Sequence, residues 1–162
     1  MSGVSVGELG EHAFARGLTT GQLERLAALA IRVELPAGCR LFEEGGNAAR
    51  LWLVRSGQIA LDLRVPGRER IIVETLGPGD ELGLSWLTPA AQWQFGAMAQ
   101  LPVSAFEFSS AALVDLCETD HELGYQLARR LLGTAIDRLQ AARIRILDLY
   151  AAPAPARGGG TP

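Results

Sequence analysis

The chain has 162 residues, of which 48% are hydrophobic and 20% are charged, and this is the balance of a soluble globular domain. A folded chain of this size buries about 70% of the surface that its unfolded form exposes, so one core is stable without metals or disulfides. The formal net charge is −3, which excludes the broad positive field that drives non-specific binding to nucleic acids.

The sequence carries no signal for a membrane or an oxidising compartment. The N-terminal residues include Glu8 and Glu11 and lack the basic and apolar regions of a signal peptide. No apolar run approaches the about 18 residues that a transmembrane helix needs. Cys39 and Cys117 are too few for a four-thiolate metal site, and we expect reduced, buried thiols. These features predict a cytoplasmic protein without membrane partners.

The first predicted element is a short amphipathic helix. Thr19 and Thr20 are candidate N-cap residues, and the apolar residues that follow them fall on one stripe up to Ala30. From residue 31 to residue 108 the sequence changes to short runs of aliphatic and aromatic residues, separated by Gly and Pro turns about ten residues apart. This spacing is typical of a β-sandwich or β-barrel.

Two hairpins are predicted within the β region. Leu51–Val54 and Ile59–Leu63 are expected to form strands joined by a tight turn at Ser56-Gly57. A second hairpin follows, and its tip at residues 64–70 is rich in arginine. We expect this tip to be a solvated loop without a site role.

Helical spacing returns after residue 108. Thr119 and Glu122 have the spacing of a capping box, which predicts that a long helix starts there and continues to about residue 150. Pro153 and Pro155 end this helix. We therefore expect one domain over residues 1–150 and a disordered, Gly-rich tail over residues 151–162.

Apolar residues of the long helix repeat at alternating intervals of four and three, which is the spacing of a coiled-coil seam. The seam residues are Ala128, Leu132, Ala135, Leu139, Ala142, Ile146 and Leu149. A second set, expected to face the β region, comprises Leu127, Leu131, Ile136, Ile144 and Leu147. This pattern predicts a homodimer through the helix, although the seam tolerates larger assemblies. The alternative is a helix buried wholly within one chain.

The order of these elements resembles the cyclic-nucleotide-binding domain of the catabolite activator protein superfamily. Leu35–Gly38 and Leu41–Gly45 are similar to the entry into the β-roll of that family, and Leu51–Ile59 is similar to its strand, Gly turn, strand motif. Leu76–Asp80 matches the Gly-Asp entry into its ligand cassette. The resemblance covers about residues 14–150.

The resemblance implies a mainly β fold with flanking helices. We expect a jelly-roll-like β-roll with an N-terminal helix and a long C-terminal dimerisation helix, over about residues 119–150. Transcriptional regulators of the family carry a helix-turn-helix domain after the long helix. Because only about a dozen residues follow that helix in this sequence, we expect no direct DNA binding.

The resemblance also implies which residues hold a ligand. In nucleotide-binding members, a Gly-Glu pair opens a short helix after Gly-Asp, and an Arg followed by Ser or Thr comes about ten residues later. The Glu accepts from the ribose 2′-hydroxyl, and the Arg neutralises the cyclic phosphate. Counted from Gly79-Asp80, the Gly is Gly83, but Leu84 replaces the Glu. Trp93 and Gln94 stand at the Arg and Ser/Thr positions.

No nearby cation replaces the missing arginine, because residues 71–128 contain neither Arg nor Lys. The candidate ligand residues of this degenerate cassette are Gly83, Leu84, Ser85, Trp86, Trp93 and Gln94. Either Trp86 and Trp93 fill a collapsed cavity, or these residues line a pocket for a flatter, less charged ligand. Cyclic nucleotide is the disfavoured cofactor, and no other cofactor is expected.

These observations predict a non-enzymatic regulatory domain that acts as a homodimeric interaction or small-ligand module, with a protein partner in the interaction case. His12 and His121 lie too far apart in sequence to suggest a metal site, and we find no candidate catalytic base or nucleophile. One alternative is a genuine cyclic-nucleotide-binding signalling protein that uses Arg from elsewhere in the fold or dimer. A weaker alternative is an accessory transcriptional regulator that works through a DNA-binding partner.

Overall fold

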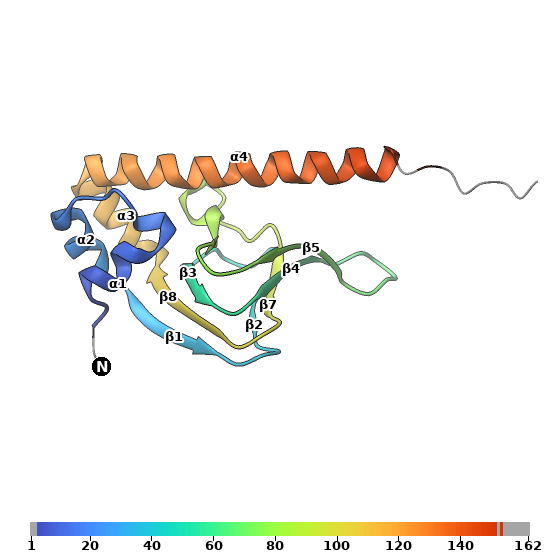
Figure 1. The fold of residues 1–162 in the computed structure, drawn as a ribbon, viewed down its shortest axis with the longest axis horizontal. Coiled ribbons are helices and arrows are strands. Elements are labelled where there is room, and N and C mark those ends of the chain that lie inside the picture. The colour runs from blue at the N-terminus through green and yellow to red at the C-terminus, as the bar shows by residue number, and fades with distance from the viewer. Residues whose placement is uncertain (1–2, 152, 154–162) are drawn as a thin grey trace, which may run out of the picture.

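Two antiparallel sheets form a β-roll in the computed structural model, which describes residues 3–151 and 153 (Figure 1). The first sheet contains, in spatial order, β1 (Ile31–Leu35), β8 (Val103–Ser109), β3 (Arg50–Ser56) and β6 (Glu81–Leu82). The second contains β2 (Arg40–Phe42), β7 (Gly96–Ala99), β4 (Ile59–Leu63) and β5 (Ile71–Leu76). The mainly β fold with flanking helices is thereby confirmed.

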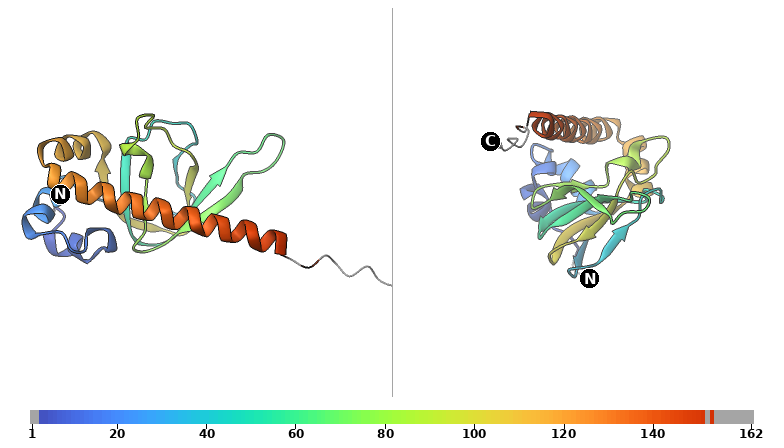
Figure 2. Two further views of the ribbon diagram at one scale, coloured as in Figure 1. Left: turned by 90° about the horizontal axis from the view of Figure 1, so that it is seen from above. Right: turned by 90° about the vertical axis from the view of Figure 1, so that its right-hand side faces the viewer.

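The helices gather at one end and along one side of the roll. They are α1 (Val6–Glu11), the 3-10 helix η1 (Ala13–Ala15), α2 (Thr20–Ala27), the 3-10 helix η2 (Leu84–Leu87), α3 (Ser110–Thr119) and α4 (His121–Ala151). Figure 1 shows α1, α2 and α3 clustered at one end of the molecule, while α4 extends past the strands toward the β4–β5 hairpin. The two views in Figure 2 show that α4 crosses one side of the roll.

The predicted N-terminal helix is present as α2, and a capping box between Thr19 and Gln22 starts it. The predicted cap of the long helix is wrong. Thr119 is the last residue of α3, and α4 starts at His121. The carboxylate of Asp120 accepts the backbone N–H of Leu123 and caps the first turn of α4. Most of the predicted tail, residues 152 and 154–162, lies outside the described residues.

The first predicted hairpin is wrong in its pairing, although its turn is present. β3 pairs with β8 and β6, whereas β4 pairs with β5 and β7. The turn at Gly57 therefore carries the chain from one sheet to the other. Consecutive residues on both sides of the turn are at most 1% exposed: Leu53, Val54, Ile59 and Ala60. A hairpin with one buried face would leave every second residue exposed, but here the sheets and helices cover both faces. The second hairpin, β4–β5, is confirmed.

The apolar core has two parts. One part packs α1, α2, α3 and the start of α4 against the first sheet and includes Phe14, Trp86 and Phe106. The other part lies between the two sheets and includes Trp52 and Trp93. The β-roll thus presents its cassette segment, residues 77–95, between these two cores and beneath α4.

Candidate functional site

A cavity with a volume of about 450 Å³ lies between the second sheet, the cassette segment and α4. The roll contributes Phe42, Leu61, Val73, Glu74 and Leu82 to its walls. The cassette contributes Gly83, Leu84, Ser85, Trp93, Gln94 and Phe95, and α4 contributes Ala135, Arg138, Leu139, Ala142 and Arg145. This volume falls within the range of small-molecule sites.

Five of the six predicted cassette residues, Gly83, Leu84, Ser85, Trp93 and Gln94, line this cavity. The exception is Trp86, which is 4% exposed and packs in the helical core instead. Trp86 and Trp93 belong to different cores, and only Trp93 lines the cavity. The interpretation as a pocket therefore fits the structure better than a cavity collapsed around both tryptophans.

Gly83 sets the geometry at the start of η2. Its φ is +105°, a left-handed conformation that favours glycine. A Cβ atom here would lie 2.6 Å from the carbonyl oxygen of Arg50 and 3.2 Å from the ring of Trp93. The glycine therefore allows the cassette to approach both β3 and the tryptophan, and this close approach directs Leu84 and Ser85 toward the cavity.

Trp93 forms a wall of the cavity and is also a core residue. Its ring stacks on Phe42 with 3.9 Å between ring centroids and an interplanar angle of 12°. Trp52 lies beside it, with 6.0 Å between centroids. Since Trp93 is 6% exposed, replacing it with Ala would cost about 3–5 kcal/mol of stability. Such a variant cannot separate ligand binding from folding.

Arg138 and Arg145 of α4 also line the cavity, although neither was among the predicted ligand residues. Arg138 Nε lies 3.4 Å from Glu74 Oε1, and the guanidinium also donates to the backbone carbonyl of Glu81. Arg145 donates to the backbone carbonyl of Val73. Both arginines follow Leu131 on one helical stripe at intervals of seven, and this spacing could have placed them opposite the roll.

Glu81 joins α4 to the cassette from the roll side. It is 6% exposed, and burial raises the pKa of its carboxyl group. The hydroxyl of Thr134 donates to Glu81 Oε1, while Arg138 binds the Glu81 carbonyl. These two bonds connect the start of the cassette to the middle of α4.

The faces of α4 differ partly from the prediction. Leu127 and Leu131 pack in the core as expected, but Ile136, Ile144 and Leu147 are 45%, 58% and 66% exposed. They do not face the roll, because Thr134, Arg138 and Arg145 occupy that face. The large seam residues Leu132, Leu139, Ile146 and Leu149 are 51% to 79% exposed, and Ala128 is half-buried. Ala135, Leu139 and Ala142 also border the cavity, so the seam and the cavity share one edge of α4.

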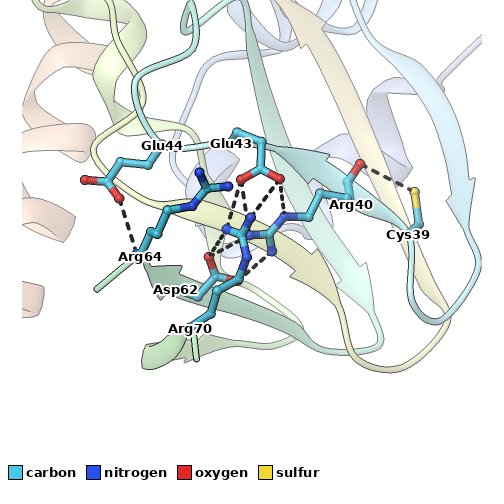
Figure 3. A network of polar contacts seen from close by, with 7 residues as sticks. All are labelled: Cys39, Arg40, Glu43, Glu44, Asp62, Arg64 and Arg70. Carbon is cyan, nitrogen blue, oxygen red and sulfur yellow. Dashed lines mark hydrogen bonds and ion pairs between the residues drawn. The ribbon is translucent and has the colours of Figure 1, made fainter. Parts of the chain in front are cut away.

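An ion cluster holds the strands that supply Phe42 and Leu61 to the cavity (Figure 3). The Arg40 guanidinium donates to both Asp62 oxygens, at 2.5 and 2.7 Å. Glu43 accepts from Arg40 at 3.0 Å and lies 2.9 Å from Arg70. These arginines keep the pKa of Asp62 below its ordinary value, chiefly through the hydrogen bonds from Arg40. The cluster therefore ties β2 to the β4–β5 hairpin.

The ion cluster also explains why residue 96 is a glycine and why one arginine of the basic loop is paired. Gly96 lies in β7 between the bonded strands, and a Cβ atom there would meet Asp62 Oδ1 at 2.5 Å and Arg40 Nη2 at 2.7 Å. The ion pair thus passes directly over a residue without a side chain. In the predicted solvated tip, Arg64 and Arg68 are exposed, but Arg70 pairs with Asp62 and Glu43.

His12 has a structural role and lies outside the cavity between the roll and α4. It is 7% exposed, its Nδ1 accepts the backbone N–H of Phe14, and its Nε2 donates to the carbonyl of Val54 at 2.9 Å. This arrangement requires the neutral imidazole. Burial is the main cause of its lowered pKa; Arg16 lowers it further, while Asp80 and the bond to Val54 act in the opposite direction.

We expect stability to fall as the pH drops below the ordinary histidine pKa of 6.5, because the unfolded chain then binds a proton that folded His12 excludes. The slope contributed by one such proton approaches about 1.4 kcal/mol per pH unit. Urea unfolding between pH 7.5 and pH 5.5 measures it. His12→Gln should lose this slope, whereas replacing the exposed His121 with Gln should keep it. Equal slopes for His12→Gln and the wild type would contradict the assignment.

Residues 32–120 match the cyclic nucleotide-binding domain family. The chain belongs to this family. A solved structure from Geobacter metallireducens GS-15, assigned as a cyclic nucleotide-binding protein, is 26% identical, with a TM-score of 0.76 over 84% of this chain and 98% of that chain. The c-di-GMP-responsive regulator CLP of Xanthomonas campestris is 18% identical, with a TM-score of 0.71 over 83% of this chain and 66% of that chain, and shows the fold alone.

The cyclic nucleotide-binding domain also resembles part of a larger curated protein. It is 27% identical over 144 residues to glutaminase 2 of Bradyrhizobium diazoefficiens, covering 89% of this chain and 22% of the glutaminase. The chain thus spans about a fifth of the length of that relative.

Within residues 3–151, no helix has the length and apolar character needed to cross a bilayer. Cys39 and Cys117 are free, half-buried thiols.

Proposed function

We propose that this domain is a homodimeric, non-enzymatic regulatory module that binds a small ligand other than a cyclic nucleotide between the β-roll and α4. The cavity of about 450 Å³ carries the proposal, because its lining joins the cassette to the helix that bears the apolar seam. Arg138 lines this space and also binds the Glu81 carbonyl, so a ligand in contact with Arg138 is expected to act on the link between α4 and the cassette. A ligand can thereby bias the position of α4.

The chemistry of the cassette wall disfavours a cyclic nucleotide in the usual orientation. Leu84 and Trp93 stand where nucleotide-binding members place Glu and Arg. A phosphate on this wall would lose a charge-assisted hydrogen bond, which costs about 1.5–3 kcal/mol. Arg138 already pairs with Glu74 across the cavity.

One observation favours the alternative of cyclic-nucleotide binding. Arg138 and Arg145 bring positive charge to the cavity from α4, which meets the requirement for an arginine from elsewhere in the fold. A nucleotide would then direct its phosphate toward the helix rather than toward the cassette. A direct titration separates this alternative from the proposal.

The apolar face of α4 supports the dimer in the proposal. Leu132, Leu139 and Ile146 are all at least half exposed in the single chain. Pairing with a second α4 would remove these side chains from water, with a gain of about 25 cal/mol for each Å² of apolar surface buried. A self-complementary seam is typical of a homodimer with two-fold symmetry.

The ligand site is tested by filling the cavity. The fluorescent dye 8-anilinonaphthalene-1-sulfonate is expected to bind the wild type at one saturable site per chain. Ser85→Trp places an indole in the cavity and should weaken dye binding at least about tenfold. The matched variant Leu87→Trp alters the same 3-10 helix at a position 43% exposed and outside the cavity, and should bind normally.

Fluorescence titration at equal fractions of folded protein provides the comparison. Circular dichroism establishes that both variants retain the wild-type fold. Absence of saturable dye binding to the wild type, or unchanged binding to Ser85→Trp, would overturn the proposed site.

A further inference from the structure

We infer that the ligand is a small organic anion with an apolar body, and that Arg145 of α4 binds its charged group. This inference rests on the proposed function and specifies the ligand class of the same cavity. It follows from the unequal distribution of charge over the walls, which places apolar side chains on the cassette and cations on the helix.

The cassette wall favours an apolar, flat body. Leu82, Leu84, Trp93 and Phe95 supply its large side chains, and Phe95 is 37% exposed at the edge of the cavity. A sugar or phosphate pressed against these residues would lose hydrogen bonds to water without gaining partners. Ser85 and Gln94 offer single polar contacts, which orient a ligand but neutralise no charge.

The charged residues of the lining leave one positive charge uncompensated. The lining contains one acid, Glu74, and two cations, Arg138 and Arg145, so its formal charge is +1. Glu74 and Arg138 form an ion pair at 3.4 Å and together add no net charge. The excess charge therefore belongs to Arg145.

Arg145 is positioned to receive an anion. Its guanidinium donates to the neutral carbonyl of Val73, and no acidic side chain in the described part of the chain forms an ion pair with it. It lies on an exposed stretch of α4 at the edge of the cavity. A guanidinium binds a carboxylate or sulfonate through two parallel N–H bonds. A cationic ligand, by contrast, would meet the net positive wall.

A matched pair of ligands tests this inference. 1-Naphthylacetate and 1-naphthylacetamide share the same flat ring and differ in whether the polar end is charged. Isothermal titration calorimetry should show about tenfold tighter binding of the acid to the wild-type dimer. Arg145→Gln should reduce the preference to about onefold, because it removes the cation and keeps a hydrogen-bond donor. Arg143→Gln removes an exposed cation of α4 outside the cavity and should retain the preference.

The outcomes separate this inference from the proposed function. Equal affinity of the wild type for acid and amide, or an undiminished preference in Arg145→Gln, would overturn the assignment while leaving a ligand site in place. Failure of both compounds to bind would also overturn it. The ligand site of the proposed function is tested separately, by the dye titration of the wild type and Ser85→Trp. Thermal melts of the two arginine variants control for folding.

Discussion

Gly57→Ala is expected to destabilise the domain by about 3 kcal/mol or more, the largest effect that we predict for a one-methyl change. Gly57 has a φ of +91°, and in this region an L-residue costs about 1–2 kcal/mol. Its Cβ would also lie 2.1 Å from the carbonyl oxygen of Pro102 and 2.8 Å from the Cα of Val103. Both contacts are with backbone, so relief requires a shift of the crossing from β3 to β4.

Gly67→Ala is the matched control for this prediction. Gly67 has a φ of +74°, but a Cβ there meets nothing within 4 Å. It should cost only the conformational part, about 1–2 kcal/mol. Urea unfolding of both variants measures the difference. If the two variants lose equal stability, the contact between the added Cβ and the backbone of Pro102 adds no cost, and the prediction is wrong.

Leu132→Glu is expected to weaken self-association at least about 100-fold, which corresponds to about 2.7 kcal/mol. Leu132 is 60% exposed in the single chain and lies in the predicted seam. In a dimer the substitution would place two carboxylates beside the two-fold axis and bury them without cations. Because Leu132 does not line the cavity, ligand binding by the monomer is a separate measurement.

Sedimentation equilibrium over a range of concentrations determines the dissociation constant. Gln140→Glu adds the same charge to an exposed position of α4 outside the seam, and this control variant should remain dimeric. A monomeric wild type, or a Leu132→Glu variant that dimerises with unchanged affinity, would show that the exposed face of α4 serves another purpose.

Local patterns predicted much of the architecture. Glycine turns at regular spacing indicated the strands, and the candidate N-cap residue Thr19 with the apolar stripe after it indicated α2. The resemblance to the cyclic-nucleotide-binding family implied Gly83 and Leu84 as ligand residues, and both line the cavity. Turns, strands and helix starts depend on residues close in sequence, and the sequence alone therefore predicted most of them.

Features that depend on tertiary packing were not accessible in this way. The sequence around Gly57 specifies a tight turn but not whether the flanking strands pair, since burial on both faces removes the alternation that marks a hairpin. Trp86 packs in the helical core rather than beside Trp93, and this placement depends on contacts with residues distant in sequence. Neither property is encoded in the spacing of apolar residues.

The sequence did not indicate which face of α4 lies against the roll. Apolar residues surround much of α4, so periodicity alone did not distinguish the side against the roll from the exposed side. The roll face contains Thr134, Arg138 and Arg145, which bond to Glu81 and to carbonyl groups of the strands. The side of α4 that faces the roll is therefore marked by polar contacts with residues distant in sequence, which apolar periodicity does not reveal.

The most direct test of the account is isothermal titration of the purified protein with cyclic AMP, cyclic GMP and cyclic dinucleotides, with the mass of the same sample measured by light scattering. We predict a mass of twice the chain mass and no binding in the micromolar range, since we propose that Leu84 and Trp93 stand where nucleotide-binding relatives carry charged groups. Micromolar or tighter binding of a cyclic nucleotide would contradict the account and would show that Arg138 or Arg145 completes the nucleotide site from α4.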